Sequence, residues 1–119
     1  MDHLALAVRD PERSAAFYGA YFGFDRGRRW YDEGTVLFVY DERGFALALG
    51  PWNEPVQLPA FLHFGVGLPD PAAVKSLRER FDADGVEVVE WWEEPEYVSV
   101  KCRDPDGYVV EACWEPAEA

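Results

Sequence analysis

Residues 2 to 11 read D-H-L-A-L-A-V-R-D-P, and sixty positions later residues 62 to 71 read L-H-F-G-V-G-L-P-D-P. In both copies large apolar residues alternate with a histidine and small residues, which is typical of a strand with one buried face. An aspartate followed by a proline then suits the cap and first turn of a helix. A strand-to-helix unit that occurs twice predicts a duplicated architecture.

The residues after each predicted helix continue the repeat. Gly23 and Gly85 are placed to end the two helices, and three strand-like segments with turn residues between them follow each glycine. D-E-R-G-F at 41–45 corresponds to D-P-D-G-Y at 104–108, at an offset of 63. The predicted strands are 3–8, 24–31, 35–40, 45–50, 61–68, 86–92, 97–103 and 108–114. Each half is therefore predicted to be one βαβββ module.

Length and charge limit the class of protein. The 119 residues suit one domain, with module 1 at about 1–50, a proline-bearing linker at 51–59 and module 2 at about 60–119. A net charge of -12 disfavours nucleic acid and anionic membranes as partners. No apolar run approaches the roughly 20 residues of a membrane span, and the N-terminus has no signal pattern. We therefore expect a cytoplasmic protein.

The turn D-P-D-G at 104–107 determines which residues of the last two strands share a face. Pro105 suits the second position of a type I turn, and Gly107 suits the left-handed position that completes a three-residue hairpin loop. Counting outward from this turn, the paired residues on one face are Lys101 with Glu111 and Ser99 with Cys113. Cys102 falls on the opposite face, so a disulfide with Cys113 is not expected.

Each module has a small-residue face that carries its histidine. His3 shares its face with two alanines and His63 shares its face with two glycines, whereas the opposite faces carry leucine, valine and phenylalanine. This asymmetry predicts a core on one side and a hollow on the other. Two imidazoles and the Glu111 carboxylate facing a hollow make a two-histidine, one-glutamate metal set that leaves positions open for water or substrate.

The paired modules, the strand histidines and the ending D-P-D-G-Y-V-V-E-A-C-W-E resemble the vicinal oxygen chelate superfamily of glyoxalases, extradiol dioxygenases, fosfomycin-modifying transferases and bleomycin resistance proteins. The resemblance implies an α+β fold, in which two tandem βαβββ modules form a curved, partly open mixed sheet around a metal-binding cleft. It also implies that His3, His63 and Glu111 bind a divalent ion, with Fe, Mn, Zn and Ni all open. In short members the facing module often belongs to the partner chain, so we expect a homodimer with His3 contributed across the interface.

The sequence departs from each branch of this superfamily. Ala48 stands at the position that corresponds to Glu111 in the first module, so three protein ligands are expected where glyoxalase-like sites have four. Ala5 stands where the fosfomycin-modifying transferases carry a threonine, and the chain has no third histidine for an extradiol dioxygenase pocket. Lyase, isomerase, transferase and dioxygenase chemistry therefore all stay open.

The remaining candidate residues surround the predicted metal set. Lys101 and Glu111 are predicted to be catalytic, where Lys101 orients an anionic substrate, donates a proton, or only neutralises Glu111. Phe38 is counted opposite Ala48, so Phe38 and Tyr40 form an aromatic wall or pack within the sheet. The predicted substrate-binding residues are Phe38, Tyr40, Ser99, Lys101 and Cys113.

Two functions follow from these residues. The first is a small divalent-metal enzyme that binds an oxygen-bearing substrate and polarises it as a Lewis acid. The second is a metal-independent protein that resembles bleomycin resistance proteins and sequesters a cationic drug in an aromatic, acidic groove. The intact metal set favours the enzyme, whereas the net charge and the aromatic content favour sequestration.

Overall fold

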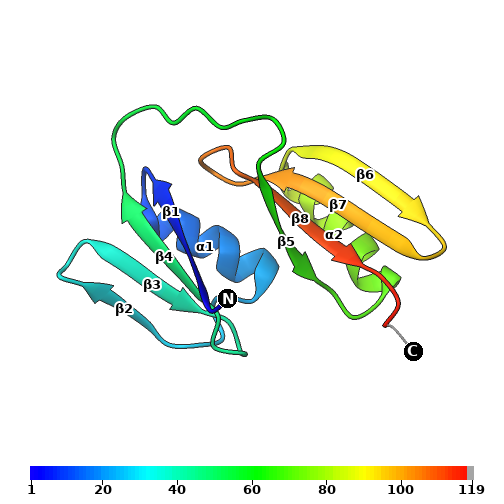
Figure 1. Ribbon diagram of the computed structural model, residues 1–119, viewed down its shortest axis with the longest axis horizontal. Helices are drawn as coiled ribbons and strands as arrows, with labels where there is room; N and C mark the ends of the chain where they lie inside the picture. The colour runs from blue at the N-terminus through cyan, green and yellow to red at the C-terminus, as the bar shows by residue number, and fades with distance from the viewer. Residues whose placement is uncertain (118–119) are drawn as a thin grey trace. The chain divides into compact units, whose positions relative to one another are not determined.

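A computed structural model of the chain describes residues 1–117. The chain divides into two compact units, Met1–Gln57 (unit 1) and Leu58–Ala119 (unit 2), and each is a βαβββ module with a four-stranded mixed sheet (Figure 1). The predicted α+β fold of two such modules is therefore confirmed.

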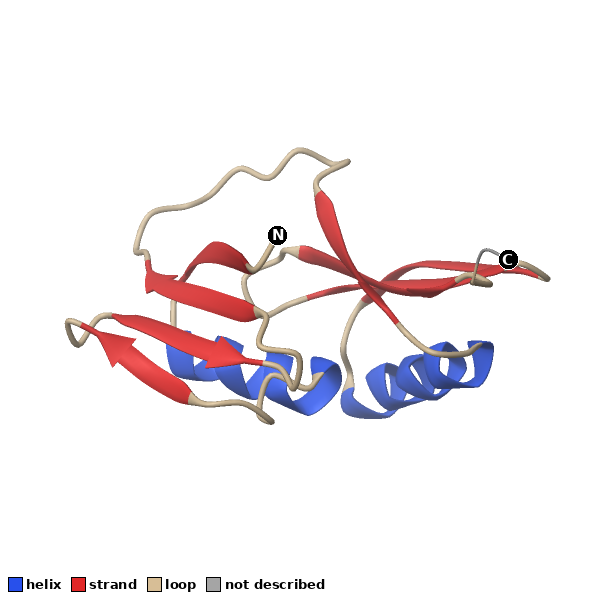
Figure 2. Ribbon diagram, turned by 60° about the horizontal axis from the view of Figure 1, so that its bottom comes forward, coloured by secondary structure: helices blue, strands red, loops and turns tan. Residues whose placement is uncertain are grey.

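Unit 1 contains one helix and four strands. Its elements are β1 (His3–Val8), α1 (Pro11–Phe22), β2 (Arg29–Asp32), β3 (Val36–Tyr40) and β4 (Ala46–Pro51). The strand order is β1-β4-β3-β2, with β1 parallel to β4 and the other neighbours antiparallel. The helix lies along one face of the sheet (Figure 2), and that face carries the buried Leu6, Leu37 and Leu49.

Unit 2 repeats this arrangement. Its elements are β5 (His63–Gly67), α2 (Pro71–Asp84), β6 (Val88–Glu94), β7 (Tyr97–Arg103) and β8 (Val109–Trp114). The strand order is β5-β8-β7-β6, with β5 parallel to β8. Between α2 and its sheet lies a core that includes Phe81, Val100 and Val110, all of which are fully buried.

The helix boundaries are where the capping residues place them. Asp10 accepts hydrogen bonds from the first backbone N–H groups of α1, and Asp70 accepts one from Ala73 N at 2.8 Å. Gly23 (φ 79°) and Gly85 (φ 73°) end the helices in the left-handed conformation that glycine adopts without strain. No helix within residues 1–117 is both long enough and apolar enough to cross a membrane.

Strand β2 begins at Arg29, so the prediction of a strand from residue 24 is wrong. Phe24 N donates to Tyr18 O at 3.2 Å, which makes this residue part of the helix end, and its ring is buried. Gly27 then passes so close to the sheet that a Cβ there would lie 2.6 Å from Tyr40 Cβ. The segment turns against the sheet edge before it pairs.

Two other strand starts lie two residues later than the sequence predicts, whereas those of β3, β4 and β8 lie one residue later. Leu62 N donates to Pro59 O at 3.0 Å, so a turn delays β5 until His63. Val86 N donates to Phe81 O at 2.9 Å, so the end of α2 delays β6 until Val88. In both places a local backbone hydrogen bond uses the donor that the strand pattern assigned to the sheet.

The last hairpin has the predicted register. Lys101 pairs with Glu111 and Ser99 pairs with Cys113, while Asp104 N donates to Tyr108 O at 2.8 Å to close the turn. Gly107 has a φ of 90°, as the left-handed position requires. In each unit one sheet face packs on the helix, and the opposite face carries the histidine and the candidate site residues.

Candidate metal and substrate site

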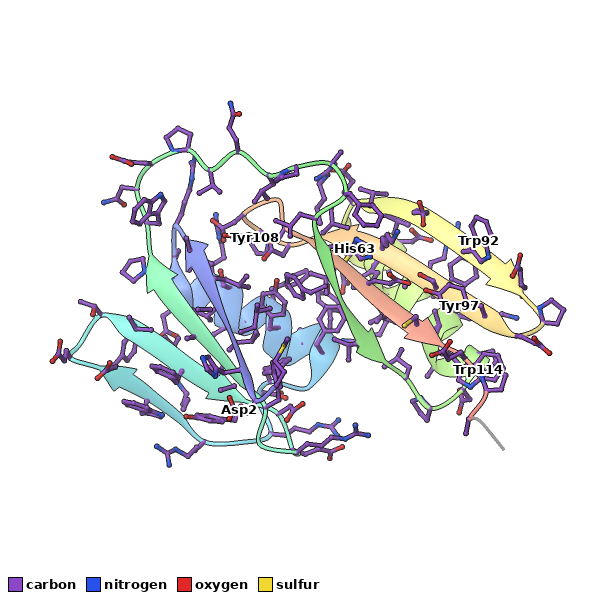
Figure 3. All side chains as sticks on the ribbon, viewed as in Figure 1. Asp2, His63, Trp92, Tyr97, Tyr108 and Trp114 are labelled. Carbon is purple, nitrogen blue, oxygen red and sulfur yellow. The ribbon has the colours of Figure 1, made fainter. Side chains whose placement is uncertain are left out.

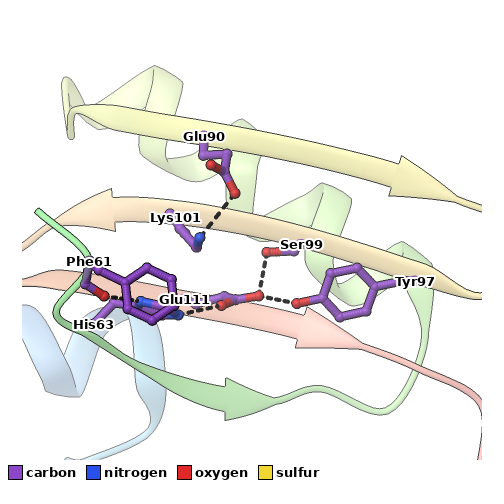
Figure 4. Close-up of polar contacts among 7 residues, drawn as sticks. All are labelled: Phe61, His63, Glu90, Tyr97, Ser99, Lys101 and Glu111. Carbon is purple, nitrogen blue, oxygen red and sulfur yellow. Dashed lines mark hydrogen bonds and ion pairs between the residues drawn. The ribbon is translucent and has the colours of Figure 1, made fainter.

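Glu111 is the centre of a hydrogen-bonded cluster on β8 (Figure 4). Its Oε2 accepts hydrogen bonds from the Tyr97 hydroxyl and from Ser99 Oγ at 2.7 Å, and the residue is only 8% exposed. Burial alone raises the pKa of Glu111, but these two hydrogen bonds, with the charges of Lys101 and His63, outweigh burial and hold the pKa below its ordinary value. The carboxylate is therefore ionised at neutral pH.

His63 on β5 directs one nitrogen at this carboxylate. Its Nε2 lies 3.3 Å from Glu111 Oε1, and its Nδ1 lies 2.8 Å from the carbonyl oxygen of Phe61. Because a carbonyl oxygen can only accept, the network assigns a proton to Nδ1. In the neutral ring Nε2 then carries the lone pair that faces Glu111.

The contact between His63 and Glu111 fits a cation. With neutral imidazole, two hydrogen-bond acceptors, each carrying a lone pair, face each other at 3.3 Å, and a proton or a metal ion between them converts repulsion into attraction. Two ligands about 2.1 Å from one ion stand about 3.0 Å apart at a right angle and about 3.4 Å apart at a tetrahedral angle. The observed separation fits two ligands of one divalent ion.

His3 on β1 of unit 1 is held in the same tautomer by a different acceptor. Its Nδ1 lies 2.6 Å from Asp2 Oδ1, so the carboxylate accepts a hydrogen bond from Nδ1–H, and in the neutral ring Nε2 carries the lone pair. The hydrogen bond to His3 lowers the pKa of Asp2. Figure 3 shows Asp2 at the start of β1 and His63 on β5. A histidine that binds metal through Nε2 commonly donates its other N–H to a carboxylate or a carbonyl.

The structure joins two of the three predicted ligands within one unit. His63 and Glu111 are in contact in unit 2, and His3 belongs to unit 1. Among residues 1–117, no three His, Cys, Asp or Glu side chains form a complete metal-binding group. The contact between His63 and Glu111 is therefore the part of the predicted set that the structure brings together.

Lys101 forms its ion pair with a residue that the sequence did not indicate. Its Nζ lies 3.0 Å from Glu90 Oε1 on β6, and its side chain is 20% exposed. Across the sheet Lys101 is also the direct neighbour of Glu111, whose pKa its charge helps to lower. Lys101 is thus a positive charge between two carboxylates.

Sequence reasoning missed Tyr97 and Glu90. Tyr97, Ser99 and Lys101 occupy every second position of β7 and therefore share one sheet face. Extending the count from Lys101 and Ser99 by two more residues would have found Tyr97. Burial and the hydrogen bond to Glu111 raise the pKa of the Tyr97 hydroxyl far above its ordinary value, so it stays a donor. The pairing of β6 with β7 shifts in register between Val88 and Glu90. Because the sequence does not indicate this irregularity, counting residues would not place Glu90 opposite Lys101.

The two cysteines lie on opposite faces, as predicted, and both are free. Cys113 lies on the face of Glu111, where burial and then the Glu111 charge raise the pKa of its thiol. Cys102 is in the core against α2, and burial raises its pKa to about 12. Both thiols are therefore protonated at neutral pH.

The aromatic residues of unit 1 have the predicted register. Phe38 pairs with Ala48, and Tyr40 pairs with Ala46. Phe38 stacks on Trp30 of β2, with ring centroids 4.6 Å apart and an interplanar angle of 7°, and Trp30 Nε1 donates to the Tyr40 hydroxyl at 3.0 Å. Trp30 is the member of this aromatic group that sequence reasoning left unassigned.

The sequence model of the Glyoxalase/Bleomycin resistance protein/Dioxygenase superfamily matches residues 1–112. The chain belongs to this superfamily. The resemblance drawn from the histidine strands and the last hairpin is thereby confirmed. No curated protein matches the chain.

Solved structures of the superfamily share the fold. A possible glyoxalase from Bacillus cereus is 26% identical, with a TM-score of 0.76, over 94% of this chain and 96% of that chain. Lactoylglutathione lyase from Agrobacterium tumefaciens is 26% identical, with a TM-score of 0.72, over 96% and 92%. The fosfomycin resistance protein FosX from Listeria monocytogenes, as an E126Q mutant with Mn(II) and 1S,2S-dihydroxypropylphosphonic acid, is 19% identical, with a TM-score of 0.78, over 98% and 92%. At this identity FosX shows the shared fold alone.

This superfamily member has two chemically different modules. The site face of unit 2 carries a charged row across three strands, whereas the corresponding row of unit 1 is apolar and aromatic. The rows are Glu111, Lys101 and Glu90 in unit 2, and Ala48, Phe38 and Trp30 in unit 1. The duplicated backbone therefore presents one polar face and one aromatic face.

Proposed function

We propose that the chain is a divalent-metal-dependent enzyme that acts on an oxygen-bearing small molecule. The observation that carries this proposal is the contact between His63 Nε2 and Glu111 Oε1, which places two potential metal-ligand atoms 3.3 Å apart. His3 is the proposed third ligand, with its Nδ1 held by Asp2. When bound, the ion supplies Lewis-acid polarisation of a substrate oxygen.

The residues around the pair hold it in place. Tyr97 and Ser99 both donate to Oε2 of Glu111, which turns Oε1 toward His63. The Phe61 carbonyl oxygen sets the tautomer of His63. These contacts fix the ligand atoms before an ion or a substrate arrives, which is how such outer hydrogen bonds raise metal affinity.

The substrate contacts that we propose lie on both site faces. Lys101 orients an anionic part of the substrate, while Ser99 and Cys113 line the same face of unit 2. Phe38 and Tyr40 offer the aromatic contacts of unit 1. Because Ala48 replaces a second carboxylate, we propose a reaction that uses a single protein carboxylate, Glu111.

Sequestration of a cationic drug is the less favoured function. The Arg28 guanidinium lies 5.6 Å from the centroid of the Trp30 ring and 5.4 Å from that of Tyr40. A cationic ligand on these rings would meet a like charge that already occupies the favourable position. The aromatic face of unit 1 therefore does not support the drug-binding function.

We also propose a homodimer in which His3 of one chain completes the site of the other. Each unit has a sheet face that its own helix leaves uncovered, and pairing of such faces would exclude water from the ligands. Sedimentation velocity of the metal-loaded protein should show a dimer. A monomer that keeps one tightly bound ion per chain would exclude a His3 ligand from a second chain.

Elemental analysis of protein purified without chelator tests the metal site. We expect one divalent ion per chain in the wild type and less than a tenth of that in His63→Ala. Glu90→Gln is the matched control, because Glu90 lies on the same sheet face but bonds to Lys101. Equal metal contents in His63→Ala and the wild type would show that the site assignment is wrong.

A further inference from the structure

Four residues of unit 1 form an aromatic platform, which we define as Arg28, Trp30, Phe38 and Tyr40. Arg29 and Tyr31, the neighbours of Trp30 in β2, both hydrogen-bond to Glu12 of α1. Since successive side chains of a strand point to opposite faces, Trp30 points away from the helix. The platform is therefore on the sheet face that carries His3.

The platform is held rigid by its own contacts. Phe38 covers one face of the Trp30 indole, and the hydrogen bond from Nε1 to Tyr40 prevents the ring from rotating. Trp30 is still 37% exposed. A large aromatic ring that is fixed and exposed offers stacking area without the entropy cost of ordering it.

Arg28 gives the platform a charge that the protein leaves unpaired. Its neighbours Arg26 and Arg29 pair with Glu42 and Glu12, but no carboxylate within residues 1–117 forms an ion pair with Arg28. The chain has 23 acidic and 11 basic residues, so the absence of a partner for Arg28 within residues 1–117 does not come from a shortage of carboxylates. A guanidinium presents a planar fork of donors that matches a carboxylate.

We propose that this platform binds a planar, conjugated anion, namely an aromatic ring that carries a carboxylate. The ring packs on the exposed part of Trp30, and the carboxylate pairs with Arg28. Tyr40 is separated from His3 by one intervening strand position, Ala46, which places them about 10 Å apart on one face. A ligand on Trp30 lies on the sheet face that carries His3, so the inference names a substrate class and rests on the proposed function for that role.

The test is binding of 2-naphthoate to the full chain after removal of metal by a chelator. Isothermal titration gives the affinity, and the NMR signal of the Trp30 indole N–H reports the position. We expect 2-naphthoate to bind and to shift this signal. Cyclohexanecarboxylate, an anion that is not planar, and 2-naphthylmethylammonium, a planar cation, should each bind at least tenfold more weakly.

Two variants and a matched control separate the contributions. Arg28→Gln should weaken 2-naphthoate binding about fivefold, the size of one exposed charge pair. Trp30→Leu should weaken it about tenfold through lost stacking. Arg80→Gln makes the same charge change on the exposed side of α2 and should leave the affinity unchanged.

Several outcomes would overturn the platform. Each of three results would refute the proposal: the wild type does not bind 2-naphthoate, Arg28→Gln binds it as tightly as the wild type does, or the wild type binds 2-naphthylmethylammonium more tightly than 2-naphthoate. The metal proposal fails separately, because it depends on elemental analysis and on His63. If elemental analysis finds no metal in the wild type, the metal site is refuted. If that same protein still binds 2-naphthoate, the platform stands.

Discussion

The hydroxyl of Tyr97 offers a direct test of how Glu111 is positioned. Tyr97→Phe removes one of the two donors to Oε2 and leaves Ser99 at 2.7 Å. With one donor the carboxylate samples more orientations, and Oε1 faces His63 for a smaller fraction of the time. We expect the metal affinity to fall while the fold is retained.

The magnitude follows from the number of hydrogen bonds. Loss of an outer hydrogen bond around a metal ligand typically lowers metal affinity by about 10-fold to 100-fold. Because Ser99 keeps half of the support for Oε2, we expect the lower end, about tenfold, or about 1.4 kcal/mol. The double variant Tyr97→Phe/Ser99→Ala removes both donors and should reach about hundredfold.

The assay is a competition titration of Mn(II) or Zn(II) between the protein and a chelator of known affinity. Tyr31→Phe is the matched control, since its hydroxyl also donates to a glutamate, Glu12, on the helix side of the other unit. Thermal melts of the metal-free variants establish that each one is folded. If Tyr97→Phe binds metal as tightly as Tyr31→Phe and the wild type, the hydroxyl does not position the ligand.

Two further predictions concern ligand binding and the core. Small bidentate oxygen ligands, such as vicinal diols or hydroxy-carbonyl compounds, should bind the metal-loaded protein and lose most of their affinity after chelation or in Glu111→Ala, as calorimetry would measure; tight binding of a cationic glycopeptide drug that is indifferent to chelation would favour sequestration instead. Phe81→Ala should lower the free energy of unfolding by about 3–5 kcal/mol in urea titrations, because its ring is fully buried, whereas Phe61→Ala, at a residue 87% exposed, should change it by less than about 0.5 kcal/mol. Similar values for the two would show that α2 is not packed on its sheet as described.

The features that sequence alone predicted correctly are those set by short-range geometry. Asp10 and Gly23 bound α1 because a side-chain acceptor and a left-handed residue satisfy the helix ends locally. The pairing of Lys101 with Glu111 follows from the length of the D-P-D-G turn, since a hairpin loop of known length leaves one register. The sequence predicted the strands that begin at Arg29, His63 and Val88 to start earlier. These predictions were wrong because nearby backbone acceptors compete for the same N–H groups.

For the site, the sequence by itself determined the sheet face of the residues that it predicted, such as His63, Lys101 and Glu111, but it did not indicate Tyr97 or Glu90. Period-two alternation and the matched offset of His3 and His63 are sufficient for that assignment, as both depend only on position along the chain. The tertiary structure alone decided which atoms meet. Tyr97 and Ser99 donate hydrogen bonds to Oε2 of Glu111, the Phe61 carbonyl oxygen accepts one from Nδ1 of His63, and Lys101 donates one to Glu90. These contacts depend on side-chain rotamers and on neighbours across strands, which become defined only when the sheet has formed.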